Sequence, residues 1–245
     1  MKNIFLIAIA LSFTFSGARS AEVSGSFSMP VTKTYKYDYL VILPDAYKPT
    51  EALPLLLFLH GSGERGEDVQ VVKTHGPFKK LQADRIPMII VAPQCPKGEW
   101  WTPEVLSGLL SEVEKKYSVD PSRVYLTGLS MGGYGAWSLA AYEPERFAAV
   151  APICGGGEPA DARKLVGIPV WAFHGNKDTA VELTKGQAMI DGLKDAGGDP
   201  KFTIYEGVGH DSWTQTYEDE EFYKWMFAQK RESNKTAKPG APANP

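Results

Sequence analysis

The chain has 245 residues and a formal net charge of −3, with 43% hydrophobic and 22% charged residues. These values are typical of a soluble globular protein of one domain, and they exclude a fibrous or wholly disordered chain. Charges of both signs are mixed along the sequence, and no basic stripe could neutralise a phosphate backbone, so nucleic acid is not an expected partner.

The first twenty residues have the pattern of a secretory signal peptide. Lys2 precedes the apolar run 4–15, and the small residues Ala18 and Ser20 follow it. The run is shorter than the roughly 20 apolar residues that span a bilayer, which favours export over a membrane anchor. We therefore expect residues 1–20 to be removed. The mature chain would lie in the periplasm or the medium, without stable membrane association.

Seven short apolar segments are predicted to be the strands of one sheet. They are residues 37–43, 53–60, 88–92, 124–127, 148–153, 169–174 and 201–205. The five central segments are almost continuously apolar, as parallel strands buried on both faces are. Helical patterns alternate with them at residues 102–117, 134–142, 183–196 and 218–231. The sequence thus predicts an α/β fold, a doubly wound and mostly parallel sheet with helices on both faces.

This α/β domain is expected to span residues 21–231. Only residues 155–168 separate two of its predicted strands, where many lipases carry a helical lid, so no large cap is expected. Residues 232–245 are polar and rich in Pro, Ala and Lys without apolar periodicity, and they are predicted to form a disordered tail.

The two cysteines, Cys95 and Cys154, each follow a predicted strand. An oxidising compartment would permit a disulfide between them. The expected strand order, however, puts two other strands between them, about 14 Å at strand spacing, which exceeds the reach of a disulfide unless the loops curl together. The sequence leaves open a disulfide or two half-buried thiols.

A serine lies in the tight turn between a predicted strand and a predicted helix. The segment Gly128-Leu129-Ser130-Met131-Gly132-Gly133 follows strand 124–127 and precedes helix 134–142. A nucleophile elbow has this context, because glycines two positions before and after the serine let strand and helix approach closely. An ordinary glycine-rich turn shares the five-residue pattern, so the strand and helix carry the argument. We predict that Ser130 is a nucleophile.

A serine nucleophile needs a base, and the base needs an orienting acid. Asp178 follows strand 169–174 and His210 follows strand 201–205, so both fall at the carboxyl edge of the sheet. The chain order Ser, Asp, His is that of the α/β-hydrolases. We predict His210 as the general base and Asp178 as its acid.

Other acids and histidines compete for these roles. Glu158 and Glu206 are possible substitute acids. His60 and His174 each begin a His-Gly turn at a strand end, where a structural hydrogen bond is expected of them, and His75 lies in an uninformative loop.

A serine hydrolase also needs N–H donors for the oxyanion, each worth about 3 kcal/mol. Met131, directly after the nucleophile, is expected to supply one. The second is expected from the glycine-rich loop 60–66, with Ser62 as first choice and Gly61 as second. The alternative for this loop is a flexible surface segment.

Two adjacent tryptophans, Trp100 and Trp101, follow strand 88–92 and would lie near the same edge of the sheet. In an open site they could stack on a sugar or a phenolic ring. Equally, they could simply pack the loop.

These segments resemble the α/β-hydrolase superfamily, specifically its compact secreted serine esterases. That group includes feruloyl and acetylxylan esterases, polyhydroxybutyrate-depolymerase-like proteins, dienelactone-hydrolase-like proteins and predicted peptidases. The likeness spans residues 35–231 and is carried by segments 60–66, 92–96, 128–133 and 152–156. It implies acyl transfer to water through an acyl-enzyme, and the sequence implies no metal and no organic cofactor.

We therefore expect a secreted serine carboxylesterase acting on a small ester or on acetyl or feruloyl esters of polysaccharides. Three alternatives stay open from the sequence. They are a serine peptidase of prolyl-oligopeptidase type, a hydroxybutyrate polyester depolymerase, and a non-catalytic binding module on a hydrolase scaffold.

Overall fold

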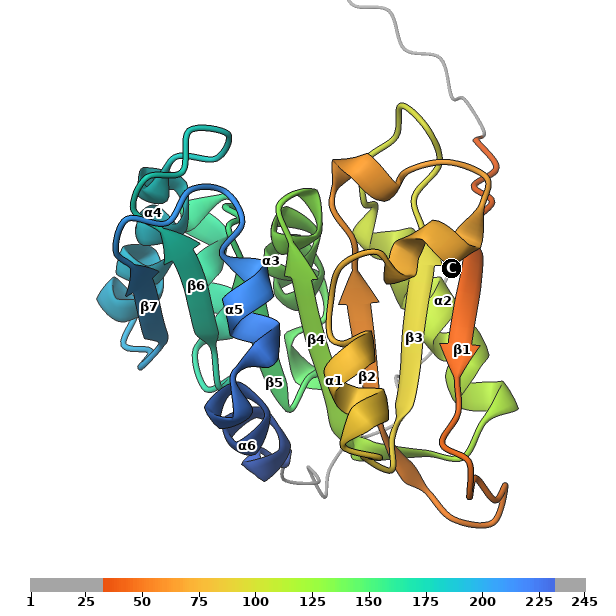
Figure 1. The fold of residues 1–245 in the computed structure, drawn as a ribbon. Coiled ribbons are helices and arrows are strands. Elements are labelled where there is room, and N and C mark those ends of the chain that lie inside the picture. Colours follow the sequence, from red (N-terminus) through yellow and green to blue (C-terminus); the bar gives the residue numbers. More distant parts are fainter. Residues whose placement is uncertain (1–32, 232–245) are drawn as a thin grey trace, which may run out of the picture. The chain divides into compact units, whose positions relative to one another are not determined.

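In residues 33–231, which are those the computed structural model describes, seven strands form one sheet in the order β1-β3-β2-β4-β5-β6-β7 (Figure 1). The strands are β1 (Asp38–Ile42), β2 (Leu53–Leu59), β3 (Ile89–Gln94), β4 (Val119–Leu129), β5 (Ala149–Ile153), β6 (Trp171–Gly175) and β7 (Lys201–Tyr205). The edge strand β1 runs antiparallel to β3, and the other neighbouring pairs are parallel. The predicted fold class is confirmed. The expected signal peptide and tail lie outside the described residues.

Helices cover both faces of the sheet. The helices α2 (Pro103–Lys116), α3 (Met131–Tyr142) and α4 (Leu183–Asp195) pack on one face, and α1 (Phe78–Ala83), α5 (Trp213–Glu218) and α6 (Glu220–Ala228) pack on the other. Four 3₁₀ helices lie in the connections, at η1 (Ser62–Glu64), η2 (Val69–Lys73), η3 (Pro144–Arg146) and η4 (Pro159–Leu165). The connection from β5 to β6 contains η4 and no inserted cap, as the sequence predicted.

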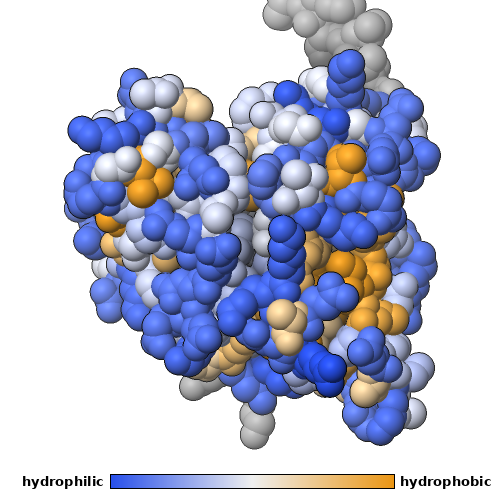
Figure 2. All heavy atoms as spheres, in the orientation of Figure 1, coloured by the Kyte–Doolittle hydropathy of each residue, from blue (hydrophilic) through white to orange (hydrophobic). Residues whose placement is uncertain are grey.

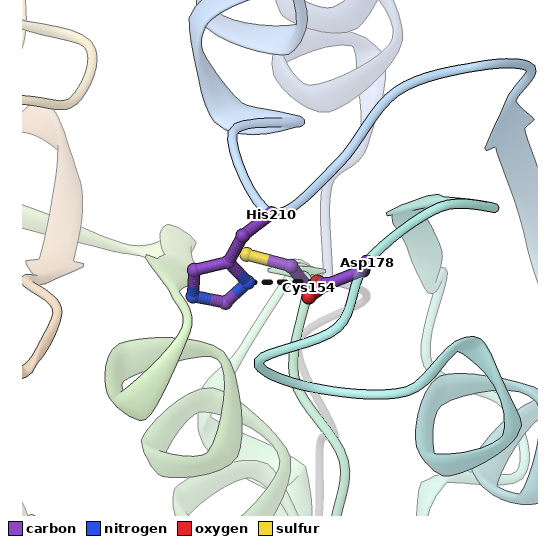
Figure 3. A group of neighbouring side chains, drawn as sticks. All are labelled: Cys154, Asp178 and His210. Atoms are coloured by element: carbon purple, nitrogen blue, oxygen red, sulfur yellow. Dashed lines mark hydrogen bonds and ion pairs between the residues drawn. The ribbon is translucent and has the colours of Figure 1, made fainter.

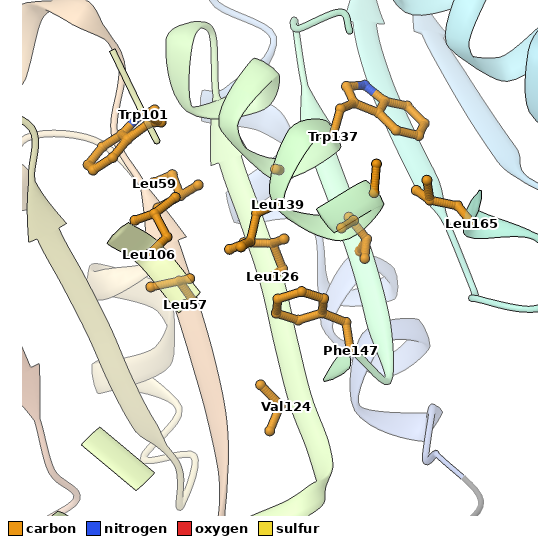
Figure 4. Close-up of a cluster of buried hydrophobic side chains, with 14 of the residues drawn as sticks. Leu57, Leu59, Trp101, Leu106, Val124, Leu126, Trp137, Leu139, Phe147 and Leu165 are labelled. Atoms are coloured by element: carbon orange, nitrogen blue, oxygen red, sulfur yellow. The ribbon is translucent and has the colours of Figure 1, made fainter. Parts of the chain in front are cut away.

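The hydrophobic core has two halves because side chains alternate along each strand. Leu57 and Leu59 of β2 point into the half shared with α2 and α3, where Trp137 is among the largest buried side chains (Figure 4). Phe58 points into the other half, where it meets Phe78 of α1 edge to face. The central strands are thus buried on both faces, which fixes the positions of the loops at their carboxyl ends.

Three features of this architecture differ from the predictions made from the sequence. The six-residue helix α1 is too short to show a clear period. The predicted helix 218–231 is the shorter α6, and the preceding helix α5 was not predicted. Asp219 separates the two, because its side chain accepts a hydrogen bond from the N–H of Glu221 and so begins a new helix. Strand β4 begins at Val119 rather than at residue 124, since it pairs with Leu53 across a register shift.

The two cysteines are free and buried. Strands β2 and β4 lie between the strands that carry them, as expected. The structure thus shows free thiols rather than a disulfide, and both are fully buried rather than half-buried as predicted.

A cavity of about 590 Å³ lies beside the edge strand, between β1, α1 and the segment 43–46. Apolar residues are exposed over this part of the surface in Figure 2. Neither Ser130 nor the other two residues of the predicted triad line it. This cavity is therefore not the site that the sequence predicts at the carboxyl ends of the strands. Among residues 33–231, no helix combines the length and the apolar character needed to span a bilayer.

Candidate active site

Ser130 occupies the turn between β4 and α3 with a φ of 53° and a ψ of −118°. A positive φ is strained for a residue with a side chain and persists only where the surroundings hold it. The N–H of Ser130 donates to the carbonyl oxygen of Ile153, at 3.0 Å, and to Sγ of Cys154, at 3.3 Å. The strand β5 therefore holds the strained serine in place.

Glycines around the serine are required by backbone contacts. A Cβ added at Gly132 would lie 1.9 Å from the carbonyl oxygen of Leu59, and one added at Gly128 would lie 2.4 Å from the carbonyl oxygen of Gly132. A Cβ at Gly133 would lie 2.5 Å from the carbonyl oxygen of Ile153. The atoms in the way belong to the main chain of β2, β5 and α3, which cannot swing aside as a side chain can.

A chain of hydrogen bonds joins the three residues that the sequence singled out. Nε2 of His210 lies 2.9 Å from Oγ of Ser130, and Nδ1 lies 2.7 Å from Oδ2 of Asp178. The other carboxylate oxygen, Oδ1, accepts the N–H groups of Ala180 and Val181, each at 2.9 Å. The side chain of Asp178 is fully buried, whereas that of His210 is 28% exposed.

The loops that carry Asp178 and His210 are tied to each other. Lys177 donates its N–H to the carbonyl oxygen of Val208 at 2.8 Å, and Gly207 donates its N–H to Oδ1 of Asn176 at 2.8 Å. His210 and Asp178 are therefore held as one unit at the ends of β7 and β6.

This arrangement can activate the serine hydroxyl. The buried carboxylate accepts a hydrogen bond from Nδ1–H of His210, which leaves Nε2 free to accept the proton of Ser130. The carboxylate also stabilises the imidazolium that forms when the proton moves.

The competing residues have other partners. Glu206 accepts a hydrogen bond from Nδ2 of Asn176, and Glu158 accepts one from the main chain at the start of η4. His174 is buried, and its Nε2 lies 2.8 Å from the carbonyl oxygen of Val181, to which it can donate, and 3.4 Å from Oδ2 of Asp178. Of the three acids considered from the sequence, Asp178 is the one that meets His210.

The predicted oxyanion donors lie on two different elements. Met131 is the first residue of α3, so its N–H has no partner within the helix. Ser62 begins η1 and is exposed, while Gly61 is buried beside Leu129.

Side chains anchor the loop 61–66. Arg65 donates through Nε to the carbonyl oxygen of Ser62 and through Nη1 to that of Glu99, both at 3.1 Å. Gln94 donates to the carbonyl oxygen of Glu64 at 2.8 Å. The loop thus has defined contacts with the end of β3 and with the segment that follows it.

His60 joins this loop to the segment after β3. Its Nε2 accepts the N–H of Cys95 at 3.0 Å, so Nδ1 carries the ring proton and donates to the carbonyl oxygen of Gly61. Burial lowers the pKa of His60 to about 4, which keeps the ring neutral. This is the structural kind of role expected for it from the sequence.

The two tryptophans have different positions. Trp101 is only 7% exposed, belongs to the core, and donates from Nε1 to the carbonyl oxygen of His60. For Trp101 the packing alternative therefore holds, and its ring is not available for stacking on a substrate. Trp100 is 60% exposed and lies edge-on to Tyr134, one helical turn beyond Ser130.

A second aromatic group, which the sequence did not indicate, contacts the base. The ring of Trp213 meets that of His210 edge to face, with centroids 5.3 Å apart. The ring of His75 also contacts Trp213, with centroids 5.5 Å apart. Nε2 of His75 is 3.7 Å from Oε1 of Glu64, whose side chain is 11% exposed. The one sequence signal for Trp213 was its place three residues after His210.

Cys154 also borders the triad, and Figure 3 shows its sulfur beside the His210 ring. Burial raises the pKa of Cys154 to about 12, so the thiol is neutral. Its φ of 40° places it in the left-handed region.

Residues 31–237 match the dienelactone hydrolase family. The chain belongs to that family. Among its curated relatives, a bifunctional acetylxylan esterase/xylanase of Neocallimastix patriciarum is 26% identical over 64% of this chain and 24% of its own length. A probable feruloyl esterase C of Aspergillus flavus is 26% identical over 64% of this chain and 62% of its own. The chain thus spans less than two thirds of these relatives.

Solved structures of esterases share the fold of this dienelactone hydrolase family member. A thermostable esterase is 31% identical, with a TM-score of 0.74 over 80% of this chain and 60% of that one. A ferulic acid esterase from Anaeromyces mucronatus is 21% identical, with a TM-score of 0.57 over 78% of this chain and 84% of that one.

Proposed function

We propose that this dienelactone hydrolase family member is a secreted serine carboxylesterase that hydrolyses acetyl or feruloyl esters on polysaccharides. The observation that carries the proposal is the hydrogen-bond chain from Oγ of Ser130 through His210 to the buried carboxylate of Asp178.

The first half of the reaction forms an acyl-enzyme. Oγ of Ser130 attacks the ester carbonyl while Nε2 of His210 takes the hydroxyl proton. The N–H groups of Met131 and Ser62 stabilise the oxyanion of the tetrahedral intermediate. His210 then gives the proton to the departing alcohol, and the acyl group stays on Ser130.

The second half uses water in place of the alcohol. His210 takes a proton from the water, whose oxygen attacks the acyl carbonyl, and returns that proton to Oγ of Ser130 as the acid leaves. Asp178 stays ionised and orients the imidazole throughout.

Two features support an ester on a bulky polymer as the substrate. The connection between β5 and β6 adds only η4 to the described structure, so no cap stands over the serine. The exposed ring of Trp100, supported by Tyr134, offers a face for a sugar or a phenolic ring. Relatives named as acetylxylan and feruloyl esterases are consistent with this choice.

The test compares wild type, Ser130→Ala and the control Ser138→Ala on 4-nitrophenyl acetate, methyl ferulate, acetylated xylan and a prolyl anilide. Ser138 lies on the same helix and donates only to the carbonyl oxygen of Gly135. We expect ester hydrolysis to fall by at least about 10⁴-fold in Ser130→Ala, and to persist in Ser138→Ala. An active Ser130→Ala would refute the nucleophile, and cleavage of the anilide alone would refute the esterase assignment.

A further inference from the structure

A soft-metal ligand set lies inside the triad. Sγ of Cys154, a ring nitrogen of His210 and a carboxylate oxygen of Asp178 lie within 4.8 Å of one another (Figure 3). The sequence showed no metal pattern, because these residues are far apart along the chain and meet only where β5, β6 and β7 end. Thiolate sulfur, imidazole nitrogen and carboxylate oxygen are the donors that zinc binds in proteins.

We propose that a thiophilic divalent cation, with Zn²⁺ and Cd²⁺ as its probes, binds Cys154, His210 and Asp178 and switches the hydrolase off. The proposal rests on the proposed function, since it describes regulation of the same site. It does not make the metal a cofactor of the reaction.

The geometry needs a small adjustment to close around an ion. Zinc bonds of about 2.0 to 2.3 Å in a tetrahedron put ligand atoms roughly 3.3 to 3.8 Å apart. Cys154 and Asp178 are buried, so the adjustable ligand is His210, whose side chain is 28% exposed on the loop between β7 and α5. Nδ1 of His210 lies 2.7 Å from Oδ2 of Asp178, so the ring must shift by about 1 Å away from the carboxylate to let an ion enter between them. This shift would complete the three-ligand set, and water would fill the fourth position.

The charges of the site favour a dication. The side chain of Asp178 is fully buried, and a bound metal deprotonates a coordinating thiol. One carboxylate and one thiolate then balance the two positive charges of the ion, so no net charge is buried.

Binding would remove the base by changing its tautomer. In the metal-free triad Nδ1 is the ring nitrogen that faces Asp178, and Nε2 accepts from Ser130. A metal on Nδ1 uses the lone pair of that nitrogen, so the ring proton moves to Nε2, which can then no longer accept the proton of Ser130. The thiol proton passes to solvent. Nothing is oxidised or reduced, and removal of the metal restores the original triad.

The experiment measures the rate of 4-nitrophenyl acetate hydrolysis as Zn²⁺ is added to enzyme freed of metal by a chelator. The rate of each variant is divided by the rate of the same variant without zinc. Cys154→Ala is compared with Cys95→Ala, which removes the other buried thiol. We expect inhibition of wild type and Cys95→Ala to be reversed by EDTA. The half-inhibiting zinc concentration should rise at least about tenfold in Cys154→Ala, since even residues that only support ligands change metal affinity by 10–100-fold. Equal inhibition of Cys154→Ala and wild type would overturn the proposal, as would a wild type insensitive to Zn²⁺.

A second readout separates this proposal from the proposed function. Cd²⁺ bound to a thiolate gives an ultraviolet charge-transfer band that needs no enzymatic activity, so it is measured on wild type, Ser130→Ala and His210→Ala. Ser130→Ala should give the wild-type band although its ester hydrolysis is expected to be largely lost. His210→Ala should need at least about tenfold more Cd²⁺ and carries the test if Cys154→Ala does not fold. Absence of the band in wild type, or an unchanged titration of His210→Ala, would refute the metal site even in an active esterase.

Discussion

The turn at Ser130 and the loop 61–66 lie at the carboxyl ends of neighbouring strands, but they are held in different ways. Main-chain atoms of β2, β5 and α3 crowd the turn, so close that a single methyl group at Gly132 has no room. The loop is held by hydrogen bonds from the side chains of Arg65, Gln94 and His60. The turn is therefore fixed by the fold itself, whereas the loop depends on a few replaceable side chains.

The largest expected effect is a loss of unfolding free energy when a methyl group is added to the turn, compared with the same addition in the loop. Gly132→Ala would place a Cβ 1.9 Å from the carbonyl oxygen of Leu59, whereas nothing lies within 4 Å of a Cβ at Gly63 in the loop. We expect Gly132→Ala to lose more than about 3 kcal/mol of unfolding free energy and Gly63→Ala to change it by less than about 0.5 kcal/mol. Urea unfolding followed by circular dichroism measures both. Similar losses in the two variants would remove the contrast between the regions.

The next largest effect is the contribution of His60, which anchors the loop 61–66, to the pH dependence of the unfolding free energy. Because burial lowers the pKa of His60 from 6.5 to about 4, the unfolded chain binds the proton first as pH falls. The contribution of His60 to the unfolding free energy is constant above pH 6.5, declines as pH falls from 6.5 to 4, and levels off below pH 4. At pH 4.5 the loss from His60 is about 2.5 kcal/mol.

This prediction is checked by urea unfolding of wild type and His60→Gln at pH 7.5 and pH 4.5. The loss of stability between the two pH values should be about 2 to 3 kcal/mol smaller in His60→Gln, because glutamine does not titrate. Equal losses would mean that His60 is not held neutral by the fold.

The smallest effect is expected at Arg65, whose removal should lower activity by displacing the loop. Arg65→Ala should lower kcat by about 10- to 100-fold with little change in KM, because a displaced oxyanion donor weakens binding of the transition state only. Arg65→Lys should recover little, since an ammonium cannot bond Ser62 and Glu99 together in a fork. The exposed neighbour Glu67→Ala serves as the control, and a change in KM alone would contradict a positioning role.

Much of this molecule could be predicted from patterns within single segments. The apolar runs predicted the strands, and the glycines around Ser130 predicted the tight turn that the structure contains. Asp178 and His210 were found because parallel strands end at one edge, so their positions along the chain fixed their positions in space. The structure brings these two residues to Ser130, and their catalytic roles stay predictions.

Features that depend on contacts between segments could not be predicted. Nothing in the Trp100-Trp101 pair says which ring turns into the core, since that depends on the space beside His60. Trp213, His75 and Glu64 come from three separate segments, namely the start of α5, the segment after η2 and the end of η1. Cys154 was expected just past the end of a strand, but the contact of its Sγ with the N–H of Ser130 depends on how the loops fold.

The short connection between β5 and β6 has a kinetic consequence. Lid opening limits turnover in many enzymes that enclose their substrates, and η4 occupies only seven residues of this connection. An enzyme built in this way should show no interfacial activation. Its rate per dissolved substrate molecule should pass smoothly through the concentration at which an ester begins to form micelles, and attachment of the same ester to an insoluble polymer should slow encounter rather than chemistry.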